Sequence, residues 1–292
     1  MEEIVKKLQP KKVQFTRTDG IPLPDCECPE DVKKSFSLLT KSSRYTWNDN
    51  TVQFFYMEKD CDEKFGHIAT LLSLIQPRHA LHADIFLSPI KKYYPTDKVF
   101  GPPNVNTGYA TSEKIVVYRE EEWLKVFIHE CWHYFKFDAL LFNPELTPRI
   151  LKLFPVQSEV NIYESYCEMW ARTLNCCMIA AHKNLDVGRL LQREKKHAIR
   201  HMVNVLHKME LTYHDIQVPN AYTEKTNVLA YVVLCCIVMN SNYIEKNNCP
   251  FALLDVESYM KCIEDNYRNE DLLLAINHTI PQVTTTMSIL SM

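Results

Sequence analysis

Glycine is scarce in this sequence, with only five among 292 residues. No two of them are spaced to form GxGxxG or GxxxxGK, the loops with which many nucleotide-binding proteins hold phosphate. The sequence therefore argues against nucleotide-binding folds that depend on such loops. The scarcity also suits a helix-rich chain, because each interior glycine costs a helix about 1 kcal/mol relative to alanine.

Long apolar runs and a strong excess of charge are missing as well. The longest apolar stretch is Val228–Met239, roughly half of the ~20 residues that a membrane-spanning helix needs. The first residues are charged where a secretory signal would be apolar. The net charge of -3 gives no reason to expect a nucleic acid or a membrane as partner. We therefore expect a cytoplasmic protein.

Cysteine, in contrast, is plentiful, with 11 residues. An odd count in a long chain, with several cysteines inside apolar runs, favours reduced thiols that pack as small hydrophobic groups. Cys26 and Cys28 form a CxC pair with Cys61 further on. A zinc site there is the weaker interpretation, because no second pair completes it.

The hydrophobic pattern predicts a mixed amino-terminal third. We expect an extended arm over the first 25 residues and a short helix over 29–40. A hairpin over 45–57 and a helix over 62–75 follow, then strands over 83–87 and 114–118 separated by a proline-rich loop.

The remaining two thirds read as helices, over 119–137, 159–182, 188–210, 224–243 and 255–266, before a loosely held tail after residue 278. The three glutamates of 120–122 suit the positive end of the first of these helices. The fold class is α+β, mainly helical with a small mixed sheet. We divide the chain into a region over 1–95 and a second over 96–292, with one continuous domain as the alternative.

The segment 127–135 contains the motif HExxH, formed by His129, Glu130 and His133. Residues four apart share one face of a helix, so the two imidazoles can converge on a single cation. Glu130 lies on an adjoining side, within reach of a water held by that cation. Zinc then needs a third protein ligand and an open position for the water.

The third ligand is not in the extended pattern HExxHxxGxxH, because Lys136 and Ala139 stand where its glycine and last ligand belong. Downstream, Glu164 and Glu168 are four residues apart on the next predicted helix, and their neighbours are aromatic or apolar. From spacing alone, either of these glutamates or Glu159 can serve as the ligand.

Here the chain resembles the gluzincin class of zinc metallopeptidases, in which a second helix supplies a glutamate in the pattern NEGxAEY. The resemblance implies that Glu164 is the ligand and that Glu168 supports the site from behind. The sequence departs from the pattern at Tyr163, Ser165 and Cys167, which replace its asparagine, glycine and alanine. The implied fold is a mainly helical zincin-like catalytic domain with a small mixed sheet bordering the active-site helix.

A broader stretch, residues 106–231, is similar to zincin-like peptidases of large DNA viruses. For a viral protein the expected location is the host cytoplasm or the virion. In zincins a strand near the active-site helix borders the cleft and pairs with extended substrate. That role falls here to 106–111, with Asn106, Gly108 and Tyr109 as its candidate residues.

The resemblance implies zinc-dependent hydrolysis of peptide bonds with one zinc ion, Glu130 activating a zinc-bound water. The substrate is then a peptide or protein. Glu168 or Asp138 can orient a ligand histidine through its second ring nitrogen. For stabilising the oxyanion we name Tyr231, with Tyr163, Tyr222 and His201 as further candidates.

Two other interpretations compete with the peptidase. The chain can be a non-catalytic zincin-fold module that binds zinc or a partner protein, although such a site has no need of Glu130 as a base. It can also be a helical scaffold with an accidental motif. His197 and His201 have i,i+4 spacing too, but they lie among basic residues and are interpreted as a solvated face.

Overall fold

Six strands form a single mixed sheet in the order β1-β2-β3-β4-β6-β5. The computed structural model describes residues 1–58, 60–247, 249–282 and 285–290. The strands are β1 (Thr16–Asp19), β2 (Lys41–Trp47), β3 (Asn50–Tyr56), β4 (His82–Phe86), β5 (Gly108–Ala110) and β6 (Ile115–Val117). β4 and β6 run parallel to β3, whereas β5 returns antiparallel to β6 and forms one edge.

Alternation along the strands gives the sheet two buried faces. Phe54 on β3 and Ile85 on β4 belong to the main core, which also contains the apolar side of α3 (Asp62–Ile75). Their neighbours Phe55 and Phe86 point to the opposite face and stack there. α2 (Glu30–Ser35) contributes to the small core on that side.

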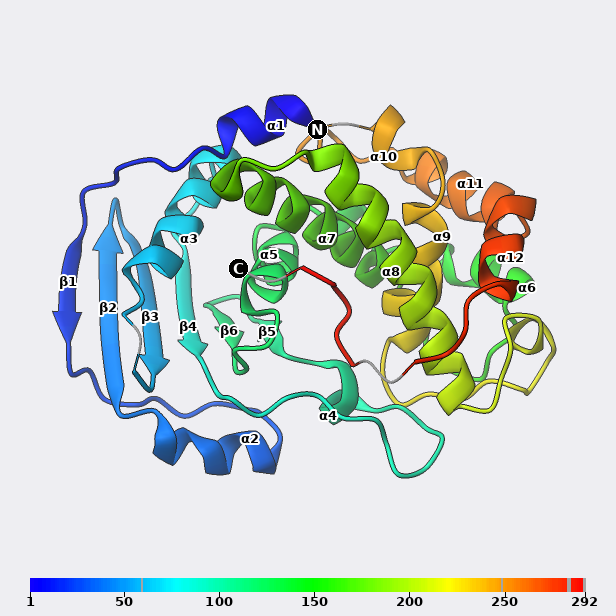
Figure 1. Cartoon of the computed structure of the whole chain (residues 1–292), viewed down its shortest axis with the longest axis horizontal. Coiled ribbons are helices and arrows are strands. Elements are labelled where there is room, and N and C mark those ends of the chain that lie inside the picture. The colour runs from blue at the N-terminus through cyan, green and yellow to red at the C-terminus, as the bar shows by residue number, and fades with distance from the viewer. Residues whose placement is uncertain (59, 248, 283–284, 291–292) are drawn as a thin grey trace.

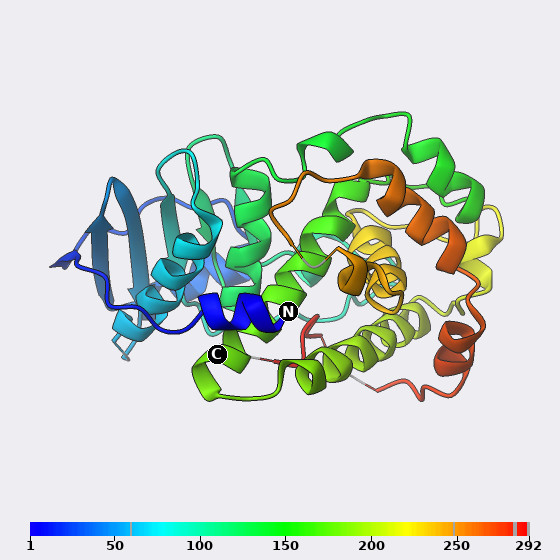
Figure 2. The same ribbon diagram turned by 90° about the horizontal axis from the view of Figure 1, so that it is seen from above.

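Within the described residues, helices make up most of the chain outside the sheet (Figure 1). Besides α2 and α3 they are α1 (Glu2–Lys7), α4 (Pro102–Val105), α5 (Trp123–Tyr134), α6 (Thr147–Leu153), α7 (Ile162–Lys183), α8 (Val187–Lys208), α9 (Cys235–Met239), α10 (Tyr243–Lys246), α11 (Val256–Asn266) and α12 (Glu270–Asn277). Figure 2 shows the sheet at one end of the molecule and α6, α11 and α12 at the other.

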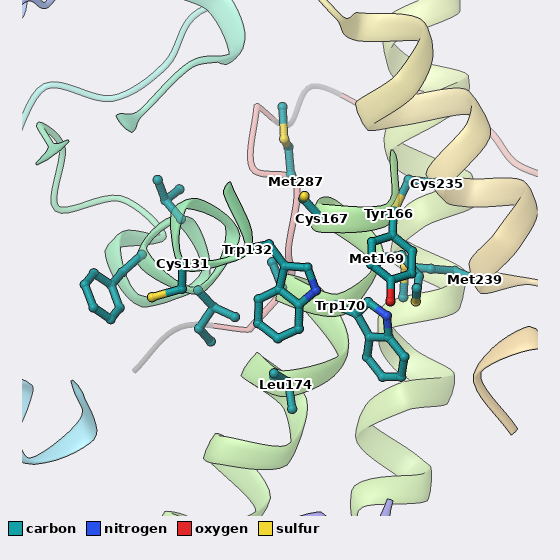
Figure 3. Packing of buried hydrophobic residues seen from close by; sticks show 14 of the residues in the cluster. Cys131, Trp132, Tyr166, Cys167, Met169, Trp170, Leu174, Cys235, Met239 and Met287 are labelled. Atoms are coloured by element: carbon teal, nitrogen blue, oxygen red, sulfur yellow. The ribbon is translucent and has the colours of Figure 1, made fainter. Parts of the chain in front are cut away.

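The packing of α5 on α7 joins the sheet to the helical part. Trp132 of α5 and Trp170 of α7 are buried, with 0% and 1% of their surfaces exposed. Figure 3 shows these indoles with sulfur-containing and aromatic side chains from α7 and α9, all in one apolar cluster. α5 therefore lies between the sheet edge and α7, with little freedom to shift.

The predicted α+β class is confirmed, and strands on both sides of residue 95 belong to the one sheet. The helix over 62–75 is confirmed with the same bounds. The arm over 1–25 is corrected, because it contains α1 and the strand β1. α6 and α12 were not predicted. No helix in the described part of the chain combines the length and hydropathy needed to cross a bilayer.

The start of α5 also differs from the prediction. The helix begins at Trp123, and Glu122 before it adopts a left-handed conformation with φ of 58°. Its carboxylate turns into the core and pairs with the buried Lys92. Glu122 thus lies at the N-terminus of α5, as predicted, and a buried ion pair also holds it there.

The tail is another correction. Met287, Ser288 and Leu290 are buried, although a loosely held tail was predicted. Main-chain groups of this segment bond to buried side chains of the helical core. Residues 283–284 and 291–292 of the same predicted tail lie outside the described residues.

Gly108 allows β5 to approach α5 closely. A Cβ atom there would lie 2.6 Å from the carbonyl oxygen of Val116 and 2.9 Å from a methyl group of Val126. Both neighbours are closer than packed atoms tolerate. Only glycine therefore fits at the point where the edge strand meets the helix that carries HExxH.

We expect Gly108→Ala to lower the free energy of unfolding by about 1–3 kcal/mol, because the added methyl group forces the strand away from α5. Gly66→Ala is the matched control: it lies within α3 with nothing within 4 Å of its Cβ position. That change should raise stability by about 0.5–1 kcal/mol. Urea unfolding of both variants measures the difference, and equal effects would contradict the close approach.

Candidate metal centre

Three potential ligand atoms from two helices converge at one point. The Nε2 atoms of His129 and His133 on α5 are 3.1 Å apart. Oε2 of Glu164, in the first turn of α7, lies 3.1 Å from the first of them and 3.3 Å from the second. Ligands of a tetrahedral zinc ion at about 2.0–2.1 Å are about 3.3 Å apart. The three atoms thus form a triangle of the size that such an ion requires.

A carboxylate contacts the second ring nitrogen, Nδ1, of each histidine. Nδ1 of His129 is 3.2 Å from Oε2 of Glu168, and Nδ1 of His133 is 2.6 Å from Oδ2 of Asp138. An ionised carboxylate only accepts hydrogen bonds, so each Nδ1 carries the proton. In the neutral rings both Nε2 atoms are then bare acceptors. In that neutral state two bare nitrogens and a carboxylate oxygen face one another, an arrangement that a cation between them would stabilise.

The supporting carboxylates are themselves fixed in the core. Lys125, one turn before His129, is 3.0 Å from both oxygens of Glu168. Lys125 and Glu168 expose 3% and 0% of their surfaces, so this is a buried ion pair. The second oxygen of Glu164 accepts a hydrogen bond of 3.2 Å from Nδ2 of Asn227. Both oxygens of Glu164 are therefore oriented.

Glu130 lies beside this centre and has no hydrogen-bond partner among the described residues. Within the described residues its carboxylate makes no recorded hydrogen bond or ion pair, and it lines a cavity of about 40 Å³ together with His129 and Tyr231. Burial raises the pKa of Glu130. An unpaired buried carboxylate with a raised pKa is suited to accept a proton from a group in the cavity.

Tyr231 reaches the cavity from an irregular helix. Residues Leu229–Leu234 form a π-helical turn before α9, a local distortion that is frequent at functional sites. The ring of Tyr231 contacts that of His129 edge-on, with centroids 5.8 Å apart. Burial raises the pKa of Tyr231 well above its ordinary value, so the hydroxyl remains a donor at neutral pH.

The start of the edge strand β5 and the residues just before it form another wall of the cavity. Asn106, Thr107 and Gly108 line it. The side chain of Tyr109 lies on the other face of the sheet, against the small core, and its hydroxyl accepts from the amide of Glu27. Of the three residues proposed for the edge, Tyr109 therefore contributes only its main chain to this side.

The other residues named from the sequence lie elsewhere. Glu159 is exposed, and Glu168 supports His129 from its Nδ1 side. Tyr222 bonds to Glu224. Tyr163 stacks on the exposed ring of Phe142 and only touches the ring of His133, with centroids 5.8 Å apart.

The interpretation of His197 and His201 as a solvated face is wrong. Both are buried, with 4% and 3% of their surfaces exposed. Nε2 of His197 is 2.9 Å from the carbonyl oxygen of Thr286 in the tail. The basic residues around these histidines, Arg193, Lys195, Lys196 and Arg200, are exposed or half-buried, so the charged composition of the segment concealed the two buried histidines.

His133, Asp138 and Cys167 form a second group of closely spaced donors. The sulfur of Cys167 is 3.7 Å from both His133 Nδ1 and Asp138 Oδ2. Since Nδ1 of His133 is bonded to Asp138 at 2.6 Å, this group is occupied in holding the ligand histidine.

Sequence reasoning missed Lys125 and Asn227. A signal for each exists: Lys125 precedes His129 by four residues, and Asn227 precedes Tyr231 by four. Residues at that spacing lie on one helical face. The same rule that identified the histidines could have extended both stripes by one turn.

Comparison with known proteins adds no relative. No protein-family model, curated protein or solved structure matches the chain. The functional interpretation therefore depends on the geometry of the site.

We expect Asp138→Asn to lower the affinity for zinc by about 10–100-fold, because the amide no longer fixes the protonated Nδ1 of His133. Glu159→Gln, at the exposed glutamate before α7, should bind zinc like the wild type. Competition with a chromophoric chelator measures both constants. Unchanged affinity in Asp138→Asn would show that this carboxylate does not orient a ligand.

Proposed function

We propose that this protein is a zinc metallopeptidase that hydrolyses peptide bonds. The observation that carries the proposal is the convergence of His129 Nε2, His133 Nε2 and Glu164 Oε2 beside an unpaired Glu130. The donor set of two imidazoles and one carboxylate suits zinc in a catalytic site, where three protein ligands leave a position open. These three residues would hold the ion.

A zincin-like arrangement is part of the same proposal. An antiparallel edge strand lies against the helix that carries HExxH, and a second helix supplies the glutamate. This arrangement supports the zincin-like fold that the gluzincin resemblance implies. The glutamate beside the two histidines is Glu164. The resemblance selected the same residue among Glu159, Glu164 and Glu168.

Zinc, when bound, lowers the pKa of a coordinated water to about 7 and polarises a substrate carbonyl. Glu130 takes the proton from the attacking water and passes it to the leaving amine. The hydroxyl of Tyr231 donates a hydrogen bond to the substrate carbonyl oxygen, on which negative charge develops. The outer side of the edge strand β5, Gly108–Ala110, offers main-chain groups to which an extended peptide can add as a strand.

A non-catalytic zinc-binding module is the second candidate. It shares the ligands, but it has no use for a buried, unpaired carboxylate, which costs folding free energy. Glu130 is such a group, and this observation favours the peptidase over the module. The accidental-motif interpretation fails to account for the two carboxylates that hold the Nδ1 atoms.

Replacement of the base tests the proposal directly. In Glu130→Gln the side chain keeps its shape but cannot accept a proton, so peptide hydrolysis should fall by about 10²–10⁴-fold. Zinc content should stay at the wild-type level, because Glu130 is not a ligand. Cleavage of a mixed peptide library, followed by mass spectrometry, measures the rate.

Glu145→Gln, at an exposed position, is the control and should cleave like the wild type. A wild-type protein that holds zinc but cleaves nothing in the library would favour the non-catalytic module. Equal cleavage by Glu130→Gln would contradict the mechanism.

Tyr231→Phe should lower kcat by about 10²-fold with little change in KM, since the hydroxyl acts mainly on the developing charge. Tyr163→Phe is its counterpart, because Tyr163 also touches a ligand histidine but lies outside the cavity lining. Steady-state kinetics on one cleaved peptide separate the two tyrosines. A larger loss of kcat in Tyr163→Phe than in Tyr231→Phe would show that Tyr163, and not Tyr231, stabilises the developing charge.

A further inference from the structure

The C-terminal segment Thr285–Leu290 runs through the interior beside α5, as the red trace in Figure 1 shows. Its residues Met287, Ser288 and Leu290 expose 4%, 3% and 9% of their surfaces. Ile289 between them is 40% exposed. The segment thus lies in a slot with one side open to solvent.

The slot holds the segment mainly by its main chain. The amides of Met287 and Ser288 both donate to the carboxylate of Glu122, and the amide of Ile289 donates to Glu194 at 3.2 Å. On the acceptor side, the carbonyl oxygen of Leu290 takes a hydrogen bond of 3.2 Å from Asn175 Nδ2.

His197 Nε2 lies 2.9 Å from the carbonyl oxygen of Thr286. Contacts to five consecutive residues, all through main-chain atoms, are the way in which proteins hold extended peptides irrespective of most side chains.

The walls of the slot remain charge-paired without the segment. Glu122 is paired with the buried Lys92, and Glu194 with the buried Arg172 at 2.8 Å. Removing one member of a buried ion pair is costly, but here both members belong to the walls. Departure of the segment therefore leaves no uncompensated buried charge.

The slot is continuous with the metal centre through Met287. This side chain lines the same cavity as His129 and Glu130, and its sulfur is 3.8 Å from Lys125 Nζ. The cavity of about 40 Å³ has room for water beside the histidines. Met287 forms part of its wall, so a peptide side chain that takes the place of Met287 would lie beside the metal centre.

We propose that the slot lined by Glu122, Asn175, Glu194 and His197 is a binding site for an extended peptide, occupied at rest by the chain's own Thr285–Leu290. A substrate peptide displaces this segment to reach the metal centre. Only the nature of the incoming ligand depends on the proposed function. The slot and its occupant are independent of any metal.

Peptide binding to the full-length chain tests the proposal. The probe is a fluorescein-labelled peptide with the sequence of residues 285–290, and EDTA in the buffer prevents hydrolysis. Met287→Ala combined with Leu290→Ala weakens the resident segment and leaves the walls of the slot intact. The probe binds only those molecules whose slot the resident segment has left, so a tightly held segment weakens the apparent affinity for the probe. This variant should therefore bind the probe at least about tenfold more tightly than the wild type.

Ile289→Ala is the matched control, since its side chain faces solvent. It should bind the probe like the wild type. Equal affinity of the double variant and the wild type, with the double variant folded by circular dichroism, would overturn the proposal.

A second measurement uses the wild-type chain and decides the matter if the double variant does not fold. Hydrogen exchange at the amides of residues 287–289 should be slow in the free protein and faster with excess acetylated peptide of the same sequence. Exchange that the peptide does not alter would show that the segment is a fixed part of the core. Both measurements omit metal, so their failure is distinct from a failure to hydrolyse peptides.

Discussion

The site depends on the contact of two polar stripes inside an apolar core. Along α5 the stripe is Lys125, His129 and His133, and along α7 it is Glu164 and Glu168. Each side chain bonds to one on the opposite helix. Buried charges are expensive unless they are paired. The helices can therefore pack in one register only, and that register aims three acceptors at one point.

Apolar packing keeps this register in place. Trp132 and Trp170 fill the space around the helices, and Gly108 lets the edge strand approach without a gap. A π-helical turn then brings Asn227 and Tyr231 to the same centre. The site thus draws on the sheet edge, the central helix pair and the segment before α9, which are far apart in the sequence.

Much of the site was predictable because it follows from helical spacing. The i,i+4 rule placed His129 with His133 and Glu164 with Glu168, and the resemblance selected Glu164. Asp138 was also predicted as a support, and its oxygen lies 2.6 Å from His133. The π-helical turn was not predictable in this way, because tertiary packing and not local periodicity determines it.

The buried charges explain the largest errors. Glu122, Glu194 and His197 look like solvated residues in the sequence because their neighbours are charged. Their partners are Lys92, Arg172 and the tail, between 22 and 166 residues away. No local pattern reveals such pairs, so the tail was predicted as loose although it is bound in the interior.

The most direct test of the account is X-ray absorption spectroscopy of the zinc-loaded protein. We predict one zinc ion with two imidazole nitrogens and carboxylate oxygen at about 2.0–2.2 Å. Sulfur at about 2.3 Å would place the ion at the cysteines and contradict the assignment of His129, His133 and Glu164. A protein that binds no zinc under these conditions would contradict it equally.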